Sequence, residues 1–368
     1  MREFYIGLMS GTSLDGIDAV IADFSDNGSN LLCSHYQPYP KSVRQKLQKI
    51  CSKAASIQEL AEMDTLLGKL YVESALAVLK KGSFGGEDIL AIGNHGQTIC
   101  HSPEQPNPYT LQIGDPNLIA ELTGIPVVAD FRRRDIAVGG QGAPLVPAFH
   151  QAIFSSSTEN RAIINIGGIA NITYLPCSKA EEIVGFDCGP GNTLMDFWIE
   201  THSGKTFDHN GNWARSGKVN QALLKRLLAD PFFALSPPKS TGTDYFSPQW
   251  LQNRLDELGL QISNEDVQAT LTELTAQTIS TAAGKLSSEN LNLYICGGGA
   301  QNDYLMERIR QLSGSPTETT ESLSVSPDWV EAMAFAWLAR QTINGLPGNL
   351  PEVTGASHPV ILGGIYKP

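Results

Sequence analysis

The sequence predicts an α/β fold with two domains. Short apolar runs typical of strands alternate along the chain with longer segments of helical periodicity, which is the pattern of α/β proteins. Two units of strand, glycine-containing turn and strand occur far apart, at 4–24 and 161–175. The chain has 368 residues, of which 41% are hydrophobic, and this is enough for two domains with a substantial core.

The first half begins with a predicted hairpin and a long helix. Apolar residues at 4–8 and 17–24 predict two strands, joined by turn-forming residues within MSGTSLDGID at 9–18. Ser56 and Glu59 form a capping-box pattern that predicts the start of a helix. Apolar residues then recur every three to four positions and predict its buried face: Ile57, Leu60, Met63, Leu67, Leu70 and Ala77.

Three further elements precede a predicted domain boundary. They are a short strand at 90–93 that ends in the turn NHGQT, a helix from Asp115-Pro116 to Gly124, and a buried strand at 125–129. The charge run at 130–135, with a glycine-rich stretch behind it, is the candidate boundary. We therefore expect domain I at 1–135 and domain II at 136–339, with residues 340–368 packing back on domain I.

The second half repeats this order. The expected elements are a hairpin at 161–175, a strand at 183–187, a helix at 191–201, a helix that begins with the capping pair Ser263 and Asp266, a strand that ends at Cys296, a loop at 314–322 and a helix from Ser326-Pro327 to Ala339. The two halves share no detectable repeat beyond their hairpins.

The first turn has the composition of a phosphate site. Its backbone N–H groups and the hydroxyls of Thr12 and Ser13 fall in one small space, and Gly11 allows close approach of a ligand. The carboxylates of Asp15 and Asp18 would repel a bare phosphate, which suggests a divalent metal between carboxylate and nucleotide. An ordinary polar hairpin is the alternative.

Two more glycine clusters support a nucleotide site. Gly167-Gly168, followed by Asn171, resembles the first turn, so the two hairpins look like halves of one clamp. The cluster 297–299, with Asn302 behind it, joins a strand to a helix and suits a flat or anionic ligand. No Lys follows Gly11, which excludes the Walker A loop, and no strand precedes a G-x-G-x-x-G sequence.

Three polar side chains follow predicted strands. Asp187 comes at a strand end before a glycine turn, where a carboxylate points toward a cleft; its alternative role is to cap the next helix, although Asn192 is closer to the helix start. His95 and Gln97 lie in the NHGQT turn. His101 is too far from His95 in sequence for the usual spacing of metal ligands, so a metal site at His95 is not expected. The roles left for His95 are a hydrogen bond to a sugar, to the domain interface or to the local backbone.

Composition excludes several classes of partner. The net charge of −12 argues against binding to nucleic acid and to anionic membranes, and leaves ATP possible because ATP arrives with Mg²⁺. Six cysteines without C-x-x-C spacing fit free thiols in a reducing compartment. No secretory or transmembrane segment is evident, so we expect a cytoplasmic protein. A homodimer is one oligomeric state that the sequence leaves open.

Six motifs together carry a family resemblance. They are GTSLDGID at 11–18, NHGQT at 94–98, GQGAPLVP at 140–147, NIGGIANIT at 165–173, FDCGPGN at 186–192 and CGGGAQN at 296–302. In this order they resemble the anhydro-N-acetylmuramic acid kinases. The resemblance implies two related actin-like or hexokinase-like (ribonuclease H-like) domains that flank an ATP cleft.

The resemblance also implies roles for individual residues. ATP would contact the three turns through Gly11, Thr12, Ser13, Leu14, Asp15, Gly16, Ile17, Asp18, Gly167, Gly168, Asn171, Gly297, Gly298, Gly299 and Asn302. Asp15 or Asp18 would bind Mg²⁺ directly or through water. The sugar would contact His95, Gln97, Glu331 and either Arg132 or Arg133, which could grip its lactyl carboxylate. A self-paired arginine bend and a helix-dipole role for Glu331 are the alternatives.

The implied reaction is unusual for a kinase. In 1,6-anhydro-N-acetylmuramic acid, O6 is bonded to C1, so water must attack C1 while O6 leaves and takes the γ-phosphoryl group. Asp187 would be the base for that water, as in an inverting glycosidase, and the product would be N-acetylmuramic acid 6-phosphate, formed in cell-wall recycling. The alternatives are an ordinary hexose or N-acetylhexosamine kinase and an ATPase whose output is a conformational change.

Overall fold

Two sheets with the same strand order organise the chain. The structure, a computed structural model, describes residues 3–25, 28–178, 182–286 and 291–368. It divides into unit 1, residues 1–153 and 329–368, and unit 2, residues 154–328. Within the described residues, no helix combines the length and the apolar character needed to cross a membrane.

The sheet of unit 1 has six strands. Their order is β13 (Gly364–Tyr366), β7 (Val127–Ala129), β4 (Ile89–Asn94), β1 (Phe4–Met9), β2 (Gly16–Asp23) and β3 (Asn30–Pro38). Strands β1, β2 and β3 form an antiparallel meander, β4 and β7 run parallel to β1, and β13 adds an antiparallel edge. A separate ribbon consists of β5 (Gln97–Ser102) and β6 (Tyr109–Ile113).

The sheet of unit 2 repeats that design. Its order is β10 (Val184–Pro190), β9 (Ile169–Leu175), β8 (Asn160–Ile166), β11 (Leu291–Cys296) and β12 (Thr317–Thr319). Strands β8, β9 and β10 form the antiparallel meander, and β11 and β12 continue parallel to β8. Apart from the edge strand β13, the strand order and directions are the same in both units. This is the ribonuclease H-like pattern, which confirms the prediction of two related α/β domains.

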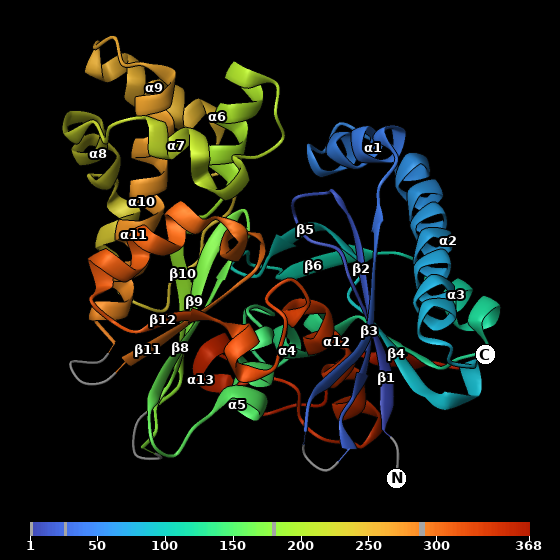
Figure 1. Ribbon diagram of the computed structural model, residues 1–368. Coiled ribbons are helices and arrows are strands. Elements are labelled where there is room, and N and C mark those ends of the chain that lie inside the picture. The colour runs from blue at the N-terminus through green and yellow to red at the C-terminus, as the bar shows by residue number, and fades with distance from the viewer. Residues whose placement is uncertain (1–2, 26–27, 179–181, 287–290) are drawn as a thin grey trace. The chain divides into compact units, whose positions relative to one another are not determined.

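Figure 1 shows the helices of unit 1. They are α1 (Lys41–Cys51), α2 (Ile57–Gly82), α3 (Pro116–Thr123), α4 (Phe131–Ala137), α5 (Val146–Phe154), α12 (Val330–Ile343) and α13 (Pro351–Thr354), with the short 3-10 helix η2 (Gly86–Asp88). Helix α12 crosses β1 and β4 at two glycines: a Cβ on Gly7 would lie 1.9 Å from the carbonyl oxygen of Ala332, and one on Gly93 2.0 Å from that of Phe335. Only glycine allows this close packing.

Unit 2 is organised around one buried helix. Helix α10 (Asn264–Gly284) is buried over most of its surface and contacts β9, β10 and four other helices. The other helices are α6 (Thr193–Ser203), α7 (Asn212–Ser216), α8 (Gln221–Leu228), α9 (Pro248–Leu258) and α11 (Asp303–Ser313), with 3-10 helices η3 (His209–Gly211), η4 (Pro231–Ala234), η5 (Gly298–Gln301) and η6 (Thr320–Leu323). Each unit has its own cluster of buried apolar side chains.

The compact units divide at positions other than those expected from the sequence. The expected boundaries are 135/136 and 339/340, whereas the units divide at 153/154 and 328/329. The charge run forms helix α4 inside unit 1. Its Asp135 is fully buried and accepts hydrogen bonds from the N–H of Gly142 (2.7 Å), Asn349 Nδ2 (2.7 Å) and Thr354 Oγ1 (2.8 Å). The glycine-rich loop and the C-terminal segment are therefore fixed together within unit 1.

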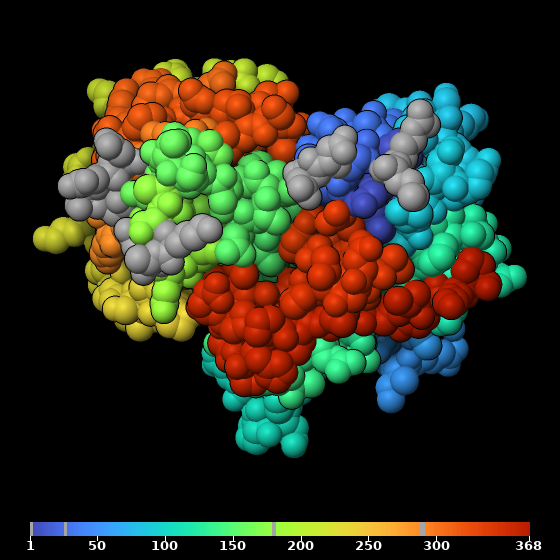
Figure 2. Space-filling view, turned by 90° about the horizontal axis from the view of Figure 1, so that it is seen from below, coloured from blue at the N-terminus to red at the C-terminus, as the bar shows by residue number. Residues whose placement is uncertain are grey.

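The C-terminal segment lies against the N-terminal strands. Helix α12 packs on β1, and Arg340 Nε donates to Glu3 Oε2 at 2.6 Å. Figure 2 shows the red C-terminal residues beside the blue N-terminal ones. Residues 340–368 are thus part of unit 1.

Several local predictions are confirmed and others are wrong. The capping box of Ser56 and Glu59 is present, Ser263 caps α10, and α3 has its Asp115 cap and Gly124 end. Ile57, expected in the buried face, is 87% exposed because it lies at the first position of α2. The helix expected at 326–339 is α12, which begins at Val330 and ends at Ile343, and the expected loop at 314–322 contains β12 and part of η6.

Candidate active site

The turn between β1 and β2 exposes backbone and hydroxyl groups. Leu14 has a left-handed backbone (φ 55°), and its N–H donates to the carbonyl of Gly11 at 3.4 Å. Its side chain is buried, which anchors the turn, while Thr12 and Ser13 are exposed. A Cβ on Gly11 would meet no atom nearer than 3.6 Å, so the space beside this glycine is open to a ligand.

Buried polar side chains support this turn from within unit 1. Ser10 Oγ donates to Gln97 Oε1 at 2.6 Å and accepts from the Tyr39 hydroxyl at 2.9 Å. Gln97 Nε2 donates to the carbonyl of Gly11 at 3.1 Å. Gln97, for which the family resemblance implies contact with the sugar, is fully buried and contacts the turn.

The two aspartates of the turn lie on one side of the hairpin. Asp15 is exposed and accepts from Ser13 Oγ at 2.7 Å, and Asp18 lies opposite Tyr36 in the β2–β3 register. Burial, followed by the charges of Asp15 and Asp18, raises the pKa of Tyr36 to about 12, so both carboxylates act on this hydroxyl. Ile17 points into the core and can offer only backbone to a ligand.

The described residues contain no cluster of side chains that could hold a metal ion by themselves. In the described part of the chain, no group of three or more His, Cys, Asp or Glu residues has the arrangement of a metal site. A metal at Asp15 and Asp18 would therefore take its other ligands from water or phosphate, as Mg²⁺ commonly does. Carboxylate oxygens in an exposed turn fit that ion.

His95, Arg132 and Glu331 form a polar cluster in unit 1. His95 Nε2 lies 2.9 Å from Arg132 Nη2, and its Nδ1 lies 3.3 Å from the carbonyl of Ser10. Arginine can only donate, so His95 is neutral with its proton on Nδ1. Burial and then the charge of Arg132 lower the pKa of His95 to about 3. Both ring nitrogens are thus used inside the protein.

Arg132 is half-buried, whereas Arg133 and Arg134 are exposed. Arg132 Nη1 donates to the carbonyl of Gly142 at 2.8 Å, and its Nε has no hydrogen-bond partner among the described residues. Burial lowers the pKa of Arg132 to about 10, although the negative charges of Glu331 and Asp135 act to raise it. Arg133 instead makes an exposed ion pair with Asp130 at 3.4 Å.

The glycine turn of unit 2 is joined to the start of α6. The carbonyl of Gly168 accepts from the N–H of Gly191 at 2.9 Å, and the carbonyl of Gly167 from that of Asn192 at 2.8 Å. A Cβ on Gly191 would lie 2.3 Å from the oxygen of Gly167, so only glycine fits there. Gly191 was not among the predicted site residues, although its place in FDCGPGN was a signal.

The third glycine cluster combines packing with an open position. Gly297 has a φ of 77°, and a Cβ on it would lie 2.3 Å from Asn165 Oδ1. A Cβ on Gly299 would lie equally close to Ile166, whereas Gly298 is exposed and has no such contact within 3.7 Å. Asn302, expected to contact the nucleotide, caps α11: its Oδ1 accepts from the N–H of Leu305 at 3.0 Å.

A polar row crosses the sheet of unit 2 beside these turns. Asn171 is paired with Asn165 on one side and with Asp187 on the other, and directly opposite residues share a face of the sheet. Asn165 is buried, and in the described parts of the chain its Oδ1 has no hydrogen-bond partner. The sequence analysis missed Asn165; its signal was an amide inside an apolar strand.

Asp187 is the carboxylate of this row. Its Oδ2 accepts from the N–H of Thr241 at 2.8 Å and from Ser240 Oγ at 3.2 Å, and its own N–H donates to the carbonyl of Lys239 at 3.1 Å. Burial raises the pKa of Asp187 to about 6, although these donors and the charge of Lys239 lower it. The helix-capping alternative is wrong, because the N-cap of α6 is Asn192.

The expected side-chain cap of α6 is also absent. Asn192 makes no side-chain cap bond, and its Nδ2 donates to the carbonyl of Ile166 at 3.0 Å. The side chain of Asn192 therefore ties α6 to the end of β8, next to the glycine turn.

Fold and site together define a class. Two ribonuclease H-like units, with glycine turns at the ends of their strands, are the construction of actin-like ATPases and sugar kinases. The family model described as "Anhydro-N-acetylmuramic acid kinase" matches residues 3–368, and the chain belongs to this family.

Curated relatives agree with the family match. Proteins named anhydro-N-acetylmuramic acid kinase from Shewanella loihica, Shewanella pealeana and Saccharophagus degradans are 49%, 50% and 51% identical, each over 99% of this chain and 99% of that protein. Among solved structures, the Acidaminococcus fermentans (R)-2-hydroxyglutaryl-CoA dehydratase component A is 11% identical, with a TM-score of 0.48 and coverage of 91% of this chain and 96% of that chain. That structural similarity is too low to bear on function.

Proposed function

We propose that this chain transfers the γ-phosphoryl group of ATP to O6 of 1,6-anhydro-N-acetylmuramic acid while water opens the anhydro ring. The product is N-acetylmuramic acid 6-phosphate, an intermediate in the reuse of cell-wall fragments. Family membership over nearly the whole chain supports the substrate class. The observation that carries the chemistry is Asp187, a half-buried carboxylate with a raised pKa and one oxygen fixed by two donors.

The substrate determines what Asp187 has to do. O6 carries no proton because it is bonded to C1, so a base has none to remove from the acceptor. The proton comes from the water that attacks C1, and Asp187 Oδ1 is available to accept it because the hydrogen bonds described for the carboxylate go to Oδ2. With a pKa of about 6, this group is mostly ionised at neutral pH and is still basic enough to act.

The glycine turns of each unit supply backbone groups to the nucleotide. Gly11 and Gly167 border open space, which suits close approach of phosphate oxygens to the chain. Exposed Gly298 is the position in the third cluster that can lie against adenosine. Asp15 and Asp18 would hold Mg²⁺, which when bound neutralises charge on the phosphates.

The cluster in unit 1 provides the sugar contacts. Arg132 has an unpartnered Nε next to the charge of Glu331, so its guanidinium can donate to the lactyl carboxylate as a further anionic partner. His95 orients Arg132, and Gln97 fixes the turn, so these two act through their neighbours. A cytoplasmic location, a homodimer and the absence of a nucleic-acid partner stay predictions.

Product analysis in ¹⁸O-water tests this function. We expect one ¹⁸O at C1 of the phosphorylated product and none in its phosphate group. Phosphorylation of a free hexose or N-acetylhexosamine without ¹⁸O at carbon would identify an ordinary kinase. Release of labelled inorganic phosphate without any sugar product would identify an ATPase.

A further inference from the structure

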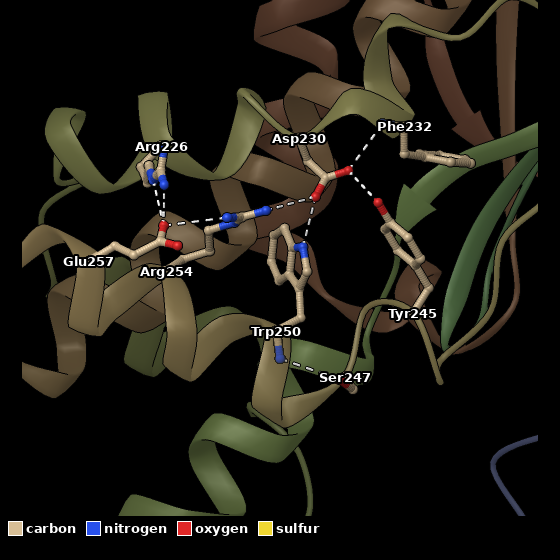
Figure 3. A network of polar contacts seen from close by, with 8 residues as sticks. All are labelled: Arg226, Asp230, Phe232, Tyr245, Ser247, Trp250, Arg254 and Glu257. Carbon is tan, nitrogen blue, oxygen red and sulfur yellow. Dashed lines mark hydrogen bonds and ion pairs between the residues drawn. The ribbon is translucent and has the colours of Figure 1, made fainter.

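One buried carboxylate closes a loop of unit 2 at both ends (Figure 3). Asp230 is 3% exposed and accepts from the N–H of Phe232 at 3.0 Å, where the loop begins. It also accepts from side chains where the loop ends: the Tyr245 hydroxyl (2.9 Å), Trp250 Nε1 (2.8 Å) and Arg254 Nη2 (3.1 Å). The segment 235–244 therefore leaves and returns to a single anchor.

This loop carries every hydrogen bond described for the Asp187 side chain. Ser240 Oγ and the N–H of Thr241 reach Asp187 Oδ2, and the carbonyl of Lys239 accepts the N–H of Asp187. Lys239 adds a second connection to the anchor, because its Nζ donates to the carbonyl of Phe232 at 3.2 Å and lies 4.5 Å from the centre of that ring.

Asp230 is ionised in this position. Burial works against the charge, but the bonds from Trp250, Phe232, Tyr245 and Arg254 together bring the pKa of Asp230 below its usual range. Four donors around one carboxylate make a rigid junction, since each lost bond would leave a buried group without a partner. Glu257 is exposed at the outer end of the network: it accepts from Arg226 and Arg254, and no contact between Glu257 and Asp230 is described.

We propose that Asp230 is a positioning residue for the base: by anchoring loop 235–244, it keeps Ser240 and Thr241 on Asp187 Oδ2 and leaves Oδ1 to the reacting water. The inference rests on the proposed function of Asp187. It adds a specific role for the polar network around Asp230, which lies more than forty residues after Asp187 in the sequence. None of the motifs described for the sequence includes this network.

The charged groups around Asp187 set the direction of the expected effect. Lys239 faces it from the loop, Lys285 at the end of α10 acts on Lys239, and the Cys188 thiol next to it is neutral because burial raises its pKa. The ionised form of Asp187 depends on its two donors and on Lys239. A loosened loop therefore favours the protonated carboxyl and weakens the base at low pH.

The experiment compares pH profiles of the full chain and its variants. Ser240→Ala removes one donor to Asp187, Tyr245→Phe removes one donor to Asp230, and Asp230→Asn removes the anchoring charge. Glu257→Gln is the matched control, because it changes the exposed part of the same network. We would measure kcat and KM for sugar and ATP from pH 5 to 9, together with Tm.

The acid limb of kcat/KM for the sugar should move upward by about one pH unit in Ser240→Ala and in Asp230→Asn, and by less in Tyr245→Phe. At pH 6 kcat should fall by roughly tenfold in Asp230→Asn, with KM for ATP within about twofold of the parent. Glu257→Gln should leave the acid limb in place. A lower Tm with an unmoved acid limb in the variants would mean that Asp230 is only structural, and would overturn the proposal.

Two results separate this inference from the function beneath it. If Asp187→Asn keeps normal turnover, the base assignment itself fails. If Asp187→Asn is inactive while the acid limbs of Ser240→Ala and Tyr245→Phe match the parent, the base stands and the positioning role of the network is refuted. These two conservative variants each delete one oxygen, so they decide the matter even if Asp230→Asn does not fold.

Discussion

Replacing Asp187 by asparagine should remove activity and at the same time stabilise unit 2. The amide has nearly the same shape, and its oxygen can still accept from Ser240 and Thr241, but it cannot take a proton from water. Loss of a general base typically costs about 10²–10⁴-fold in rate. We therefore expect kcat to fall by at least about 100-fold, with the KM for ATP changed little.

The expected stabilisation follows from the raised pKa. Burial moves the pKa of Asp187 from its ordinary 3.8 to about 6, so the folded state binds this proton more tightly than the unfolded state does. The contribution of Asp187 to the stability of the parent is therefore greatest below pH 3.8 and is lost as the pH rises through about 6. A shift of this size corresponds to at most about 3 kcal/mol, and partial exposure reduces it to on the order of 1 kcal/mol.

Thermal unfolding from pH 4 to 8 measures this contribution without any activity assay. A difference of about 1 kcal/mol corresponds to a Tm shift of roughly 2–4 °C for a unit of this size. The Tm of Asp187→Asn should exceed that of the parent at pH 8, and the difference should shrink toward zero at pH 4. A difference that does not depend on pH, or a less stable variant at pH 8, would refute the raised pKa.

Three further predictions concern the scaffold. Gly11→Val and Gly167→Val should fold, because their Cβ atoms enter open space, but should weaken binding of a non-hydrolysable ATP analogue by at least about tenfold in calorimetry; unchanged affinity in both would mean that these turns bind no phosphate. Gly191→Ala should destabilise unit 2 by about 1–3 kcal/mol in urea unfolding, because its Cβ would lie 2.3 Å from the oxygen of Gly167, and equal stability would contradict the close packing. Asp135→Ala should cost about 3–5 kcal/mol of the stability of unit 1, since it leaves three buried donors without an acceptor; a loss below about 1 kcal/mol would show that water replaces the carboxylate.

The elements that could be predicted are those whose cause is local. The hairpins at 4–24 and 161–175 follow from apolar runs around glycine turns, and the start of α2 follows from Ser56 and Glu59, three residues apart. The domain boundary could not be predicted in this way. Asp135 looks like part of a solvated charge run in the sequence, and its partners Asn349 and Thr354 are more than 200 residues away.

The same distinction applies to the candidate site. The glycine turns are encoded in contiguous motifs, whereas the groups that support them come from other strands. Asn165 and Asp187 share a polar row only because β9 pairs with both of their strands, and Ser240 reaches Asp187 across 53 residues of sequence. A motif therefore locates the turn and leaves its supporting contacts undetermined.

His95 and Gln97 show what a motif leaves undetermined. Both were expected to contact the sugar because they follow a strand in a family motif. In the structure, Gln97 bonds Ser10 and the carbonyl of Gly11, and His95 joins Ser10 to Arg132, so the NHGQT turn connects the first glycine turn to the arginine. A buried side chain with all its polar atoms satisfied has no group left to bind a ligand. It can still hold in place the neighbouring atoms that bind one. The two parts of unit 1 proposed to bind phosphate and sugar thus share one buried polar framework, which explains why this turn belongs to the family pattern even though these two side chains point inward.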